Sequence, residues 1–322
     1  MSVLIFLKLL AIFAVVALGW VAARLRWLGQ GDVARVLANA AFFLFIPALL
    51  FRTTARLDLA AMPWATLAAF FGPVLGVLLA VYAVVRWRGA SHPAAPSARA
   101  ISTTFGNAVQ LGIPLATALY GEAGLSVHLA IVSLHALTLL TLLTVLVELD
   151  LARAHALRHG VAPTLAATLL TTVRNTVIHP VVLPVLAGLA WNLGGLELPG
   201  LVDETLLVLA QAVVPLCLVV IGMSLAHYGL KGALRGALGV SVVKLIVLPA
   251  AVLLVGRFGA GVHGVPLAVI VLCAALPIGS NAMLFAQRYE TLEAEATTAV
   301  LLSTLGFVVT APLWLFILGF VN

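Results

Sequence analysis

The stretch FGNAVQLGIP, residues 105–114, places glycine, proline and carboxamide side chains inside an apolar run of the chain. That run extends over residues 98–119, and about 20 apolar residues suffice for a helix to span a bilayer. Proline removes a backbone donor and clashes with the preceding helical turn, while glycine lets the chain leave helical geometry. We therefore predict a membrane-spanning helix that is broken near its middle.

A second stretch of the same kind, ALPIGSNAM, occupies residues 275–283 within the apolar run 265–287. Irregular backbone at membrane depth is tolerated only inside protein or beside a water-filled cavity. Two interrupted helices at corresponding positions of two halves are typical of a transporter binding site. The two stretches therefore predict one site built from two broken helices.

The half-helix N-termini at such breaks carry partial positive charge, which favours an anionic ligand. The candidate substrate-binding residues are the polar, glycine and proline residues of the two stretches: Asn107, Gln110, Gly112, Pro114, Pro277, Ser280 and Asn281. A simpler interpretation is that the prolines only kink the helices and the asparagines hydrogen-bond to neighbouring helices. The matched occurrence of the two stretches favours the binding site.

The composition of the whole chain agrees with a membrane setting. Of its 322 residues, 63% are hydrophobic and 9% are charged, whereas average soluble chains carry about 25% charged residues. So little charge cannot cover a soluble surface, which excludes a soluble globular domain and a disordered chain. The chain is predicted to be an all-α polytopic membrane protein, and no nucleic-acid partner is expected despite its net charge of +6.

Apolar runs bounded by charged residues, glycine or proline divide the chain into ten predicted spans. They lie near residues 3–23, 33–51, 64–86, 98–119, 123–148, 174–193, 203–226, 235–256, 265–287 and 295–320. Two sets of five spans must insert in opposite orientations, which is the inverted-repeat arrangement of many secondary transporters. We expect a first repeat at 1–149, a short cytoplasmic linker at 150–161 and a second repeat at 162–322.

Positive charge predicts the orientation of these spans. The loops on the side where the second span begins hold 11 lysines and arginines, against 4 on the opposite side. Cytoplasmic loops carry such an excess. We therefore expect a multi-pass protein of the cell membrane, the inner membrane in bacteria, with both termini outside the cytoplasm.

Lys244 is an unusual charge within the span at 235–256. At about 1.5 Å per residue it lies roughly 15 Å deep, near the centre of the bilayer core. All 11 acidic residues fall in loops or near span ends, so none is placed to neutralise it at that depth. Lys244 is a candidate for ion coupling or charge compensation, and a lysine that snorkels to the interface is the alternative.

Other polar or small residues indicate less. His128 and His135 share one helix face and His179 precedes a proline; interhelical hydrogen bonds are favoured over a proton relay. Gly72 and Gly76 permit close helix packing, and a homodimer is one option. Two cysteines in apolar runs predict no metal site, and no cofactor is expected. The absence of HExxH, GxSxG and P-loop motifs disfavours an enzyme or an ATP-driven pump.

Four segments together resemble the auxin efflux carrier family of membrane transporters, including its bacterial members: FFLFIPALLF, GNAVQLGIPLA, VPLCLVVIGMSLA and ALPIGSNAMLFAQRY. The resemblance covers nearly the whole chain. It implies a fold similar to bile-acid sodium symporters, in which the fourth and ninth spans cross at their breaks. It also implies a scaffold of spans 1, 2, 6 and 7 and a moving transport unit of spans 3–5 and 8–10.

The resemblance further implies efflux of a small organic anion by elevator-type alternating access, either an auxin-like molecule or a dicarboxylate such as malate or malonate. Plant members often carry a long loop between the halves, whereas only about residues 149–162 stand there in this chain. Sodium-coupled uptake is the main alternative, because carbonyl and amide oxygens also bind hard cations. A channel and an intramembrane enzyme are the weaker alternatives.

Overall fold

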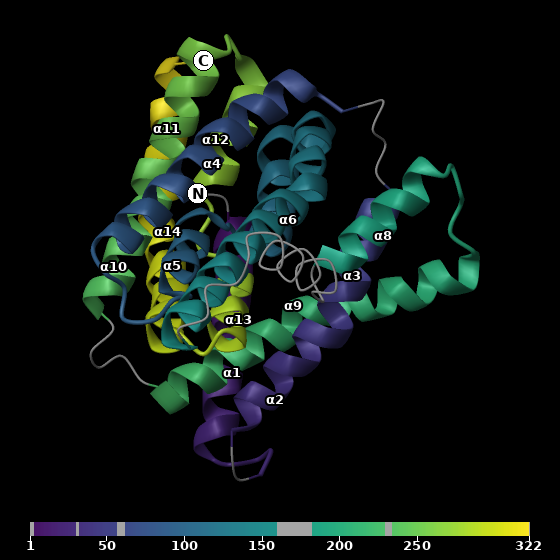
Figure 1. Ribbon diagram of the computed structural model, residues 1–322. Helices are drawn as coiled ribbons and strands as arrows, with labels where there is room; N and C mark the ends of the chain where they lie inside the picture. The colour runs from purple at the N-terminus through teal and green to yellow at the C-terminus, as the bar shows by residue number, and fades with distance from the viewer. Residues whose placement is uncertain (1–2, 30–31, 57–61, 160–181, 229–233, 322) are drawn as a thin grey trace.

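The computed structural model describes residues 3–29, 32–56, 62–159, 182–228 and 234–321, and this part of the chain is helical (Figure 1). It contains no strand, only an isolated bridge between Gly106 and Ile278. Six of the described helical stretches are long and apolar enough to cross a membrane. They are 33–55, 64–87, 119–157, 200–220, 234–259 and 293–321. The predicted all-α, multi-span architecture is therefore confirmed, and every predicted span contains described helix.

One set of helices, the α9 group, packs around the long helix α9. Its members are α1 (Val3–Arg24), α2 (Val33–Ala40), the π-helical turn η1 (Ala41–Phe45), α3 (Ile46–Ala55), α8 (Val182–Leu193) and α9 (Gly200–Tyr228). Helix α1 lies along α9, and α3 packs on both α8 and α9. Gly222 allows α1 and α9 to approach closely, because a Cβ at this position would lie 2.7 Å from the Trp20 backbone nitrogen.

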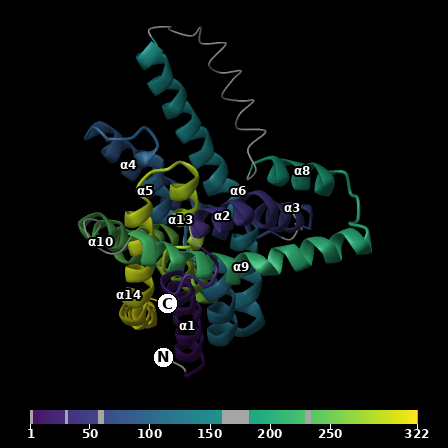
Figure 2. The same cartoon turned by 90° about the horizontal axis from the view of Figure 1, so that it is seen from below.

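The remaining helices form a second set, the α12 group. Its members are α4 (Trp64–Trp87), α5 (Ala95–Thr104), η2 (Ala108–Gly112), α6 (Ile113–His159), α10 (Leu234–Val242), η3 (Val243–Val247), α11 (Leu248–Leu254), η4 (Val255–Gly259), α12 (Gly264–Ala275), α13 (Ser280–Arg288) and α14 (Glu293–Val321). Helix α12 is its core, because Leu267 through Ala275 are all buried. In both Figure 1 and Figure 2, α3, α8 and much of α9 extend away from α4, α10 and α14.

Helix α6 contains the end of the fourth predicted span and the whole fifth span, joined by a sharp break at Gly121. The backbone there has φ 58 and ψ −149, outside helical geometry and accessible mainly to glycine. The break agrees with the predicted boundary between the fourth and fifth spans.

Prolines explain two of the π-helical turns. Pro47 and Pro249 each stand two residues after the end of such a turn, η1 and η3, and proline cannot donate the next helical hydrogen bond. Before Pro249 the Leu245 carbonyl is satisfied from outside its helix, by Trp314 Nε1 at 2.8 Å. The start of the sixth predicted span, with Arg174 and His179, lies outside the described residues.

Candidate functional site

The two broken helices meet at their breaks. Helix α5 ends at Thr104 and helical structure resumes at Ala108, while α12 ends at Ala275 and α13 begins at Ser280. The Asn107 backbone N–H donates to the Pro277 carbonyl at 2.8 Å. The Gly279 N–H donates to the Phe105 carbonyl at 2.9 Å. The broken segments therefore cross in antiparallel fashion, as the family resemblance implied, and satisfy each other's backbone.

Two buried side chains support this crossing from neighbouring helices. His128 Nε2 lies 2.7 Å from the Ala108 carbonyl, so its N–H donates there. Ser303 accepts from the Ile278 N–H at 3.0 Å and donates to the Val300 carbonyl at 3.0 Å. The predicted interhelical hydrogen bond of His128 is confirmed. The part played by Ser303 has no distinctive sequence signal, because a serine in an apolar helix can face any neighbour.

A cavity of about 110 Å³ lies on one side of the crossing, between it and the α9 group. Helices α3 and α9 supply an apolar wall that includes Leu49, Leu50 and Val213. The polar side chains that line the cavity come from α3, from α6 and from both breaks: Thr53, Thr54, Asn107, His135, Ser280 and Asn281. No charged side chain is among the described residues that line it.

The backbone around this cavity supplies partial positive charge. The turn η2 begins at Ala108 and α13 begins at Ser280, and both residues line the cavity. Helix N-termini leave N–H groups without intrahelical partners, and no side chain caps the start of α13. Two carboxamides, Asn107 and Asn281, stand beside these N-termini. We call this half of the crossing the amide side.

Lys244 abuts the crossing at Gly106 but is not among the described residues that line the cavity, and we call its surroundings the carbonyl side. It is fully buried in η3, and its Nζ donates to the Ala274 carbonyl at the end of α12. Last-turn carbonyls lack intrahelical partners and give a helix C-terminus partial negative charge. A Cβ at Gly106 would lie 3.4 Å from Lys244 Nζ, so the ammonium abuts the crossing itself. No described carboxylate forms an ion pair with it.

His135 lines the cavity, and the sequence favoured an interhelical hydrogen bond for it. Its side chain is buried, and its ring packs on Phe105 with centroids 4.4 Å apart. Within the described part of the chain its ring nitrogens have no hydrogen-bond partner. An imidazole nitrogen beside the cavity can donate to, or accept from, a ligand.

Pro277 and Gly112 are not among the described residues that line the cavity. Pro277 belongs to the crossing through its carbonyl, and Gly112 packs against Leu276 and His128. The side chains of Gln110 and Pro114 lie outside the described residues. A role for these four residues in substrate binding stays a prediction.

Comparison with known proteins relates most of the chain to one family. A family model described as membrane transport protein matches residues 4–315. Proteins named uncharacterized transporter YfdV, from Escherichia coli K12 and from Shigella flexneri, are each 32% identical to this chain over 125 residues. The matched segment is 39% of this chain, and it spans only 39% of the length of each of these relatives.

Proposed function

The chain belongs to the membrane transport protein family, the family of the auxin efflux carriers, and from that premise we propose that it is a secondary transporter for a small organic anion. The family is a transport family and not an enzyme family. The substrate, its coupling and its direction are the parts that we infer.

The observation that carries the proposal is the amide side of the crossing. A cavity there is bordered by two helix N-termini, two asparagine carboxamides, a serine and a histidine. These groups donate hydrogen bonds and attract negative charge. Such donors suit an anionic group such as a carboxylate.

The rest of the lining favours one class of carboxylate. Most of the remaining lining residues are apolar, and the described ones include no arginine or lysine. Burying a second carboxylate without a cation costs several kcal/mol, roughly speaking. We therefore favour a monocarboxylate with an apolar body, of the auxin type, over a dicarboxylate such as malate or malonate.

We assign the two helix groups to the two parts of an elevator. The α9 group corresponds to the scaffold and the α12 group, which contains the whole crossing, to the transport unit. Two breaks that pair reciprocally are the arrangement expected of two inverted five-helix repeats. Efflux is the proposed direction, as in the family that the sequence resembles.

We propose that Lys244 compensates the partial negative charge of the α12 C-terminus on the carbonyl side of the crossing. Its ammonium already donates to the Ala274 carbonyl, so that oxygen is not available as a ligand for a sodium ion. This favours sodium-independent transport over sodium-coupled uptake.

The experiment that tests the proposal starts with thermal shift of the purified protein against aromatic monocarboxylates and aliphatic dicarboxylates, with and without sodium. Ligands that raise the melting temperature are then tested for flux in proteoliposomes. Saturable flux of an aromatic monocarboxylate in sodium-free buffer is expected. Flux of none of these anions, or flux that does not saturate, contradicts a carrier of this class.

The orientation is tested separately. We propose that the end of α2 that carries Arg35 faces the cytoplasm and that both termini lie outside. In a background lacking Cys217 and Cys273, Ser2→Cys and Asn322→Cys variants should react with an impermeant thiol reagent on intact cells. Protection of both until lysis overturns this topology.

A further inference from the structure

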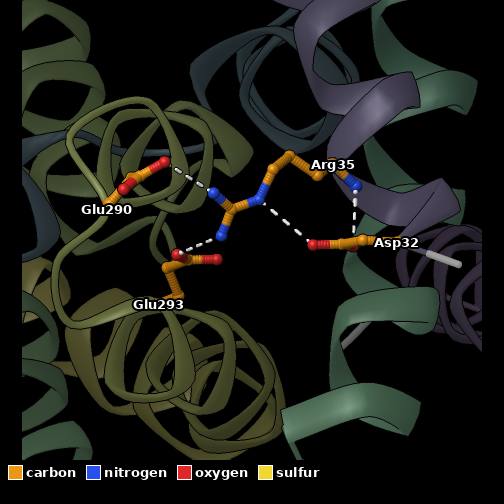
Figure 3. A network of polar contacts seen from close by, with 4 residues as sticks. All are labelled: Asp32, Arg35, Glu290 and Glu293. Carbon is orange, nitrogen blue, oxygen red and sulfur yellow. Dashed lines mark hydrogen bonds and ion pairs between the residues drawn. The ribbon is translucent and has the colours of Figure 1, made fainter.

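The α9 group and the α12 group are joined by a charged network at the end where α2 begins (Figure 3). Arg35, on α2, donates to Glu290 Oε1 at 2.7 Å and to Glu293 Oε1 at 3.1 Å. Asp32 orients the same guanidinium by accepting from Arg35 Nε at 3.1 Å. Figure 3 shows Arg35 and Asp32 facing the two glutamates, of which Glu290 lies in the loop before α14 and Glu293 is the first residue of α14.

This network differs from the other ion pairs of the described residues. Asp203 pairs with Arg52 and Arg56 inside the α9 group. Glu295 pairs with Arg99, and Asp150 with arginines of α4 and α6, inside the α12 group. Within the described chain, only the pairs from Arg35 to the two glutamates connect the groups.

The loop that carries Glu290 and leads into Glu293 is itself held in place. Glu290 and Leu292 have positive φ, 49° and 53°, a conformation that costs free energy in non-glycine residues. Between them and α13, Tyr289 donates to Glu148 of α6 at 3.4 Å. Burial raises the pKa of Tyr289, so its hydroxyl keeps the proton that it donates. The loop is therefore a fixed part of the α12 group.

A packed apolar layer lies between this network and the crossing. Phe42 of the α9 group meets Leu284 and Phe285 of the α12 group, and all three are buried. The gap among them is only about 10 Å³, room for about one water molecule. Arg288 adds a contact across the same boundary, with its guanidinium carbon 5.1 Å from the centre of the Phe43 ring. The substrate cavity lies on the opposite side of this layer, toward Thr54.

We propose that Arg35 with Glu290 and Glu293 is a latch that holds the α2 end of the group interface closed. This inference rests on the proposed function, since a latch between the two groups matters only if they move. The network must break whenever the α12 group slides along α2, whereas the pairs inside each group can persist. Because Glu290 is 71% exposed, water can replace its contact during such a movement.

The test uses the accessibility of the packed layer. Thr144→Cys, beside Asn281 in that layer, is introduced in a background lacking Cys217 and Cys273, and its reaction rate with a maleimide is measured. Arg35→Gln and the milder Glu290→Gln should raise this rate, Arg35→Gln by about three- to tenfold, because each partly exposed ion pair shifts an equilibrium only a few-fold. The matched control is Arg56→Gln, whose ion pair lies inside the α9 group, and it should leave the rate unchanged.

A charge swap provides the second variant. Arg35→Glu combined with Glu290→Arg and Glu293→Arg should return the labelling rate toward that of the parent. Equal rates in the parent, Arg35→Gln and Arg56→Gln overturn the latch. Thermal shift with indole-3-acetate on the same proteins separates the two inferences. Binding with unaltered labelling rejects the latch alone, whereas altered labelling without binding of any screened anion rejects the proposed substrate and leaves the latch standing.

Discussion

The carbonyl side and the amide side of the crossing are built by the same two interrupted helices, yet their backbone groups have different partners. On the carbonyl side a helix C-terminus meets Lys244, which is fully buried and donates to Ala274. On the amide side two helix N-termini border a cavity of about 110 Å³. The chain thus supplies its own cation on the carbonyl side, whereas no described side chain that lines the cavity on the amide side is charged.

The difference teaches how a protein can keep broken backbone inside a membrane. Each freed group needs a partner, because unsatisfied polar groups are costly in hydrocarbon. Permanent partners such as Lys244, His128 and Ser303 make the break stable. On the proposed function the substrate supplies the exchangeable partner, so the amide side is the one that we expect to bind it.

The largest expected effect comes from removing the resident cation. Lys244→Met keeps most of the side-chain volume but leaves the Ala274 carbonyl without its donor. We expect flux in proteoliposomes to fall about 100-fold, since leaving a buried carbonyl without its charged donor costs up to about 3 kcal/mol. Lys244→Arg should rescue only partly, because the head groups differ in shape.

The control for Lys244→Met is Trp314→Phe, which removes a donor to another freed carbonyl, that of Leu245, which is not part of the crossing segments. It should lower the melting temperature without abolishing flux. If a folded Lys244→Met protein transports at the parental rate, the carbonyl side does not require a resident cation.

Removing the amides should have the next largest effect. Losing a hydrogen bond to a charged group costs about 1.5–3 kcal/mol, so Asn107→Ala and Asn281→Ala should each weaken carboxylate binding about tenfold or more. Isothermal titration calorimetry measures this affinity. Asn192→Ala is the matched control, because its amide donates to the Ala55 carbonyl at 3.0 Å outside the cavity. Unchanged affinity in both crossing variants moves the binding site elsewhere.

A smaller effect is expected at His135. A neutral hydrogen bond contributes about 0.5–1.5 kcal/mol, so His135→Leu should weaken binding about two- to tenfold. His128→Leu should behave differently, because its imidazole bonds to the backbone of the crossing. His128→Leu should lower the melting temperature, whereas the affinity of the folded protein for the ligand should change little. The reverse ranking of the two variants would show that His128, and not His135, contacts the ligand.

The smallest expected effect is none. Replacing sodium with choline in the flux assay should leave the initial rate unchanged, because Lys244 already occupies the carbonyl side. A rate that depends steeply on sodium would mean that both sides of the crossing bind exchangeable partners.

The sequence by itself determined the class of fold and the places where helices break. Low charge and long apolar runs dictate membrane-spanning helices, since these satisfy their own backbone in lipid. The glycines and prolines at 105–114 and 275–283 disrupt helical hydrogen bonding locally, so the breaks are readable from a few residues. The depth of Lys244 also follows from its position in the span at 235–256.

Only the tertiary structure decided which partners these groups find. The pairing of Asn107 with Pro277, the contact of Lys244 with Ala274 and the bond from Ile278 to Ser303 join residues far apart in the chain. The same is true of Arg35 and its glutamates, more than 250 residues away. Periodicity and composition indicate which residues lie on each face of a helix. Which neighbouring residues they contact depends on how all the helices pack together, and that is a property of the whole chain.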